Sequence, residues 1–139
     1  MEIKQTIQED IMVYDLNALS SETDFPAKVV YEALRPEVDA VVEDPVRGKW
    51  FNQAIMEIIR NVQEHGKESE PRLVEVRREL GELSLYTTNT IEENSGLTGL
   101  GHFYVEEILG EAYSHTVEGD KYLGHLSIRH DTPCLLIAG

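Results

Sequence analysis

The chain has 139 residues, of which 26 are acidic and 12 basic, so its formal net charge is −14 at pH 7. This is the length of one domain, and a hydrophobic content of 41% can build a core without disulfides or a structural metal. A single cysteine excludes a disulfide scaffold, and the lack of an apolar run near the ~20 residues of a membrane helix argues against a membrane protein. The negative charge argues against direct nucleic-acid binding.

The first predicted element is a strand over residues 11–16, because this run is apolar and partly β-branched. A short helix beginning at Thr6, with Glu9 as the capping-box partner, is the alternative. The pattern therefore leaves the state of the N-terminal segment open between strand and helix.

Prolines divide the next part of the chain. Residues 17–25 are expected to form a loop, and Pro26 suits the first position of a short helix over 27–34. Pro36 is expected to open a further short helical piece that runs to Val42.

Residues 45–65 have the clearest helical periodicity, with Asp44 as a cap before the helix and Gly66 as a left-handed cap after it. The opposite face of this helix carries charges at spacings that allow ion pairs, namely Glu57, Arg60 and Glu64. The apolar residues that share one face are Trp50, Phe51, Ala54, Ile55, Ile58, Ile59 and Val62.

Residues 70–92 predict a second long helix, which the short connection after residue 65 would place antiparallel to the first. Its apolar stripe over residues 73–91 has heptad-like steps of 3, 4, 3 and 4. The stripe is expected to pack on the 45–65 helix, and it could also serve self-association. Its first members are Leu73, Val76, Leu80, Leu83 and Thr87.

A third helix is predicted over residues 98–116, after a break at 94–96. Leu126 and Ile128 then alternate with polar residues, which is typical of a half-buried strand, and residues 134–138 read as a buried strand. The predicted fold is one acidic α+β domain over residues 1–139. In it, three main helices (45–65, 70–92 and 98–116) pack on a small antiparallel sheet that includes a C-terminal hairpin over 121–138.

Four of the five histidines lie in the last forty residues, which indicates a site there. On the predicted strand, His125, Ser127 and Arg129 point to one face, where imidazole, hydroxyl and guanidinium could hold a phosphate or carboxylate. His102 and His115, on the predicted helix, are the further candidates. The simpler interpretation is the polar outer face of a hairpin.

The predicted 98–116 helix offers candidate metal ligands on two sides. Glu107, Glu111 and His115 follow at steps of four on one flank, whereas His102 and Glu106 project from the opposite side. One helix cannot bring both sets to a single ion, so we expect no metal and no cofactor. We likewise expect the glycine-rich residues 96–101 to be a connector, because neither nucleotide-binding fingerprint is present.

Two function classes remain. The first is a non-enzymatic acidic interaction module (an inhibitor, immunity-type protein or assembly subunit) that docks on a basic surface of a larger partner. It could also form homo-oligomers through the 73–91 stripe or the C-terminal strand. The second is a small-molecule binder or enzyme that acts on an anionic ligand between the 98–116 helix and the C-terminal hairpin. The polar N-terminus and the lone Cys134, expected to be buried and unreactive, favour the cytoplasm.

Overall fold

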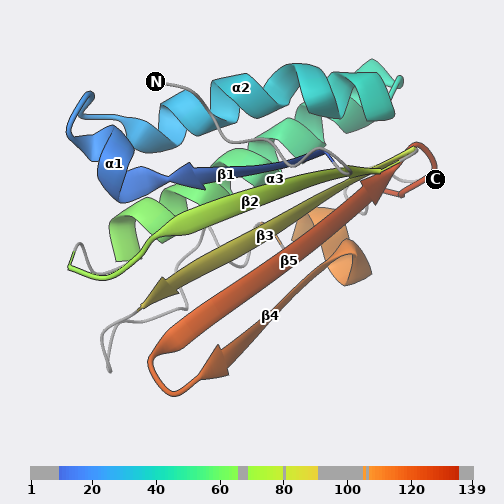
Figure 1. Ribbon diagram of the computed structural model, residues 1–139. Helices are drawn as coiled ribbons and strands as arrows, with labels where there is room; N and C mark the ends of the chain where they lie inside the picture. The colour runs from blue at the N-terminus through green and yellow to red at the C-terminus, as the bar shows by residue number, and fades with distance from the viewer. Residues whose placement is uncertain (1–9, 66–68, 80, 91–104, 106, 135–139) are drawn as a thin grey trace.

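The computed structural model describes residues 10–65, 69–79, 81–90, 105 and 107–134 (Figure 1). Five antiparallel strands form one sheet in the order β1-β2-β3-β5-β4. The α+β class is therefore confirmed. The elements are β1 (Asp10–Asp15), α1 (Leu16–Ser20), α2 (Pro26–Val41), α3 (Pro45–His65), β2 (Leu73–Glu79), β3 (Glu82–Thr90), the 3-10 helix η1 (Gly110–Ala112), β4 (Tyr113–Glu118) and β5 (Lys121–Arg129).

Helices α2 and α3 pack against each other and cover one face of the sheet, while β4 forms the sheet edge far from α2 (Figure 1). The strand side chains that point toward the helices are buried, among them Val74, Val76, Leu85, Leu126 and Ile128. Alternation along each strand places the next residue on the other face of the sheet, which we call the open face because α2 and α3 do not cover it, although Ser84 and Thr90 are buried there.

The 45–65 helix is confirmed as α3, and it supplies much of the core. The expected ion pairs are present: Arg60 contacts Glu57 at 3.2 Å and Glu64 at 3.3 Å. Trp50 is only partly buried. The other residues of the apolar face of α3 are fully or nearly fully buried: Phe51, Ala54, Ile55, Ile58, Ile59 and Val62.

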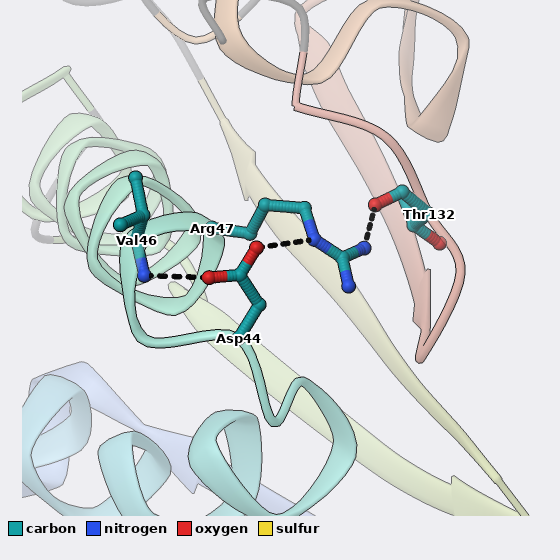
Figure 2. A network of polar contacts seen from close by, with 4 residues as sticks. All are labelled: Asp44, Val46, Arg47 and Thr132. Carbon is teal, nitrogen blue, oxygen red and sulfur yellow. Dashed lines mark hydrogen bonds and ion pairs between the residues drawn. The ribbon is translucent and has the colours of Figure 1, made fainter. Parts of the chain in front are cut away.

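Asp44 caps the start of α3 (Figure 2). Its Oδ1 accepts a hydrogen bond from the Val46 backbone N–H at 3.0 Å, and its Oδ2 lies 3.2 Å from Arg47 Nε. Arg47 Nη1 also donates to the Thr132 carbonyl at 2.8 Å, which ties the beginning of α3 to the segment after β5. The hydrogen bond from Val46 foremost, and then the contact with Arg47, lower the pKa of Asp44 below its ordinary value of 3.8.

A depressed carboxyl pKa makes the cap's contribution to stability pH-dependent. The contribution is complete above the unfolded-state pKa and is lost as the pH falls through the lower folded-state pKa. We therefore expect Asp44→Ala to lower the unfolding free energy at neutral pH, with the difference from wild type shrinking below about pH 4. Urea unfolding across this pH range checks it, and a constant difference at all pH values would contradict the charge-based cap. Glu43→Ala, an exposed neighbour, is the control.

The predicted 70–92 helix is wrong, because this segment forms the hairpin β2–β3. Its β-branched and aromatic residues favour strands. The residues that face the core alternate with a period of two, whereas the helix was predicted from apolar residues spaced three and four apart. Gly81, at φ +74° between the strands, adopts a backbone conformation suited to glycine in a tight turn. The 73–91 stripe is consequently not the face of one helix. Its members Val76 and Leu83 lie on two neighbouring strands, β2 and β3, and both point into the core.

The predicted 98–116 helix is wrong at its C-terminal end. Val105 and residues 107–109 are helical and lead into η1, but residues 113–118 form β4. The β-branched and aromatic residues of Tyr113–Glu118 favour pairing with β5 over helix continuation. The C-terminal hairpin is therefore β4–β5, and Cys134 is buried outside any strand. Residues 91–104 and 135–139, which include the expected helix start and last strand, lie outside the described residues.

The N-terminal part is more regular than expected. The strand over 11–16 is confirmed as β1, shifted by one residue, and the expected loop contains α1. Residues 26–41 form one helix rather than two pieces. Pro36 removes one helical hydrogen bond, but buried Leu34 and Val38 on either side anchor the helix to the core.

Candidate functional site

The open face of the sheet carries three of the five predicted site residues. Leu126 and Ile128 are buried as predicted, and His125, Ser127 and Arg129 project from the opposite side of β5. The alternation of residues along β5 is thus confirmed, and these three side chains share one face.

Contacts with β3 engage all three side chains. The His125 ring stacks on Tyr86, with centroids 4.4 Å apart and planes 12° apart. Ser127 donates to the Glu82 carboxylate, and Arg129 Nη2 lies 3.5 Å from Glu82 Oε1. Glu82 therefore occupies the position where an anionic ligand would accept from the hydroxyl and the guanidinium. Binding of an anion here stays a prediction, and it would require Glu82 to be displaced.

His115 lies on the other face of the sheet. It pairs in register with Gly124, whose neighbours Leu126 and Tyr122 are turned toward the core side. Its ring stacks on Tyr122 at a centroid distance of 5.3 Å. The strand conformation of β4 thus separates His115 from the His125 face, and His102 lies outside the described residues.

The candidate metal ligands of residues 107–115 do not lie on one continuous helix. Glu107 is helical, Glu111 belongs to η1 and His115 belongs to β4, so the steps of four do not stack along one flank. Among the described residues, no group of three or more His, Cys, Asp or Glu side chains could hold a metal ion.

A different site lies where α2 meets α3, and we call it the Phe25 hollow. It has a volume of about 490 Å³ and lies between the start of α2 and the second half of α3. Phe25, the residue before α2, is 66% exposed beside it. Its lining residues are Asp24, Phe25, Ala27, Lys28, Tyr31, Glu32, Met56, Arg60, Gln63 and Glu64.

The lining of the Phe25 hollow is mainly apolar, and we call its charged residues, Asp24, Lys28, Glu32, Arg60 and Glu64, the rim. Arg60 on the rim is already held by carboxylates of α3. Asp24 and Glu32 form no ion pair within the part of the chain that the structure describes, and Lys28 is the remaining cation of the rim. Uncommitted charge on this rim is therefore mainly negative.

Sequence reasoning missed the Phe25 hollow because two helices and a turn build it jointly. A usable signal was present: Phe25 is a large apolar residue directly before a helix-starting proline, and acidic residues Glu22 and Asp24 precede it. Its exposure could not be read from the sequence, since large aromatic residues such as phenylalanine are more often buried than exposed.

No protein-family model matches this chain, and no curated protein matches it either. None of the described helices is both long and apolar enough to cross a membrane.

Proposed function

We propose that this protein is a non-enzymatic acidic interaction module that docks on a basic surface of a larger protein through the Phe25 hollow. The observation that carries this proposal is an exposed aromatic side chain beside a 490 Å³ apolar hollow with an acidic rim. Large aromatic anchors surrounded by polar residues are typical of the residues that dominate binding energy in protein interfaces.

The net charge of the chain favours a partner with a basic surface. A protein of charge −14 is steered toward positive surfaces and is repelled by anionic ones. Asp24 and Glu32 on the rim would pair with lysine or arginine residues around an apolar side chain of the partner. The proposed partner is therefore a protein that presents an apolar residue surrounded by basic ones. This protein would bind it as an inhibitor, an immunity-type protein or an assembly subunit.

The cytoplasm is the compartment that suits this function. Cys134 is a free, buried thiol, and the proposed partner surface needs no membrane. A reducing compartment keeps such a thiol unpaired.

Docking is tested by placing a photo-crosslinking amino acid at position 25 or, as a control, at position 46. Val46 is 53% exposed on α3 and does not line the Phe25 hollow. Cross-linking in cells of the source organism is expected to capture a basic protein from position 25 only. The captured partner is then purified for affinity measurements.

Phe25→Ala is expected to weaken binding of that partner by about 30-fold or more, as truncation of a central interface anchor does, and Val46→Ala to leave it unchanged. Glu32→Lys should slow association, whereas Glu118→Lys at the far β4 end should have a smaller effect. Equal affinities of the Phe25 and Val46 variants would contradict docking at this hollow.

A further inference from the structure

Arg72 is a buried arginine just before β2, with 3% of its surface exposed. Its Nε donates to Asn17 Oδ1 at 2.6 Å, its Nη1 to the Gln63 carbonyl at 2.7 Å and its Nη2 to Ser20 Oγ at 3.4 Å. These bonds join α1, the end of α3 and β2. Every acceptor in the set is electrically neutral.

The described residues that bind the guanidinium therefore leave its positive charge without a counter-ion. Arg72 forms no ion pair with any carboxylate of the described residues. An arginine stays protonated in proteins and has five N–H donors, of which the three bonds above use only part. A buried, unpaired charge is costly, and an anion beside it would remove that cost.

A small polar hollow lies next to this guanidinium. It has a volume of about 240 Å³ and is separate from the sheet face that carries His125. Its wall is more polar than apolar. The lining residues are Ser20, Thr23, Asp24, Pro26, Gln63 and Arg72.

The start of α2 adds to the positive potential of this hollow. Pro26 is the first residue of this 16-residue helix, and the next N–H, that of Ala27, already donates to Gln63 Oε1 at 2.9 Å, so the helix contributes its dipole and not a free N–H donor. The N-terminal end of a helix carries a partial positive charge that favours anions. Thr23 Oγ1 accepts from the Phe25 N–H at 3.1 Å, so its own hydroxyl proton is available to a ligand.

Two other side chains limit the binding. Ser20 Oγ donates to the Leu16 carbonyl at 2.8 Å, and it would have to turn to reach a ligand. The Asp24 carboxylate lines the hollow and opposes a highly charged anion. The site therefore suits one small oxyanion that is held mainly by Arg72 and Thr23.

We propose that the hollow beside Arg72 binds a phosphate-sized oxyanion, with the guanidinium and the Thr23 hydroxyl as donors. The volume admits a phosphate or sulfate with ordered water. The proposal does not rest on docking at the Phe25 hollow, although Asp24 and Gln63 line both hollows.

The test uses the full chain and titrates inorganic phosphate against sodium chloride at matched ionic strength, followed by amide and arginine side-chain NMR. Phosphate is expected to raise Tm above the chloride control and to shift the signals of Arg72 Nε–Hε and of the amides of residues 20–27 and 63. A parallel titration with phosphoserine distinguishes a free ion from a phosphate carried on a side chain. Binding of phosphate alone supports the free ion, and stronger binding of phosphoserine supports the carried group.

Thr23→Val is expected to weaken phosphate binding about tenfold, the cost of losing a hydrogen bond to a charged group, whereas Thr23→Ser keeps the hydroxyl and should bind like wild type. Ser21→Ala, exposed and outside the hollow, is the matched control. Unchanged affinity of the valine variant, shifts confined to surface lysines, or a Tm rise equal to that in chloride would overturn the proposal. Arg72 would then act only as a structural link between α1 and α3.

Discussion

Phe51→Ala is expected to lower the unfolding free energy by about 3–5 kcal/mol, the cost of removing a fully buried aromatic side chain. Phe51 lies on α3 with no exposed surface, in the core between the helices and the sheet. Total stability of a domain is only about 5–15 kcal/mol, so this variant should be partly unfolded at moderate temperature. Urea denaturation followed by circular dichroism measures the loss.

Phe25→Ala is the matched control, because it makes the same substitution at a 66% exposed position. Surface substitutions usually change stability by no more than about 0.5 kcal/mol, and this variant should unfold like wild type. A similar loss of stability in both variants would mean that Phe25 is part of the core and unavailable to a partner.

Gly124→Ala is expected to destabilise the protein by about 1–3 kcal/mol, the usual cost of forcing extra volume into a packed interior. A Cβ at position 124 would lie 2.5 Å from Thr87 Oγ1 and 3.1 Å from the Tyr113 hydroxyl. Thr87 belongs to β3, pairs with Gly124 in register and is 2% exposed, so its stiff side chain has little room to move. Thermal unfolding of the variant gives the cost.

Thr87→Ala should rescue the Gly124→Ala variant. It removes the atom that the new methyl group meets, together with a buried hydroxyl that has no hydrogen-bond partner among the described residues. The double variant is expected to be more stable than the two single effects predict, with a coupling of about 1 kcal/mol or more. Additive effects would place the strain elsewhere in the sheet.

The elements that sequence reasoning found are those in which one pattern dominates. α3 has an uninterrupted apolar face and a capping aspartate, and both ends of the observed helix match the prediction. In β5, Leu126 and Ile128 alternate with polar residues, and pairing with β3 keeps that alternation. The local sequence determines such elements because each buries one face, and the buried residues follow a single regular spacing along the chain.

The β2–β3 hairpin was missed because two periods fit its apolar residues. Leu73, Val76 and Leu83 fit helical spacing, yet Leu73 points to the open face while the other two point to the core. Pairing with β1 and β5 selects the strand, and those partners are distant in the chain. Long-range pairing of this kind overrides local propensity.

The candidate sites were predicted less well than the fold. His125, Ser127 and Arg129 share a face as expected, but the carboxylate that engages two of them comes from β3, which was predicted as helix. The Phe25 hollow needs two separate parts of the chain, residues 24–32 and 56–64, and the hollow beside Arg72 needs three, residues 20–26, Gln63 and Arg72. Spacing along one element cannot indicate either of them.

Hydrogen exchange of backbone amides, measured in the free protein and in its complex with the captured partner, tests the docking account most directly. Protection upon binding is expected in the α1–α2 turn, the first half of α2 and the second half of α3, around residues 22–32 and 56–64. The β3–β5–β4 region should exchange at the same rate in both states. Protection that instead centres on His125 and Arg129, with residues 22–32 unchanged, would contradict the account and favour a binding site on the open face of the sheet.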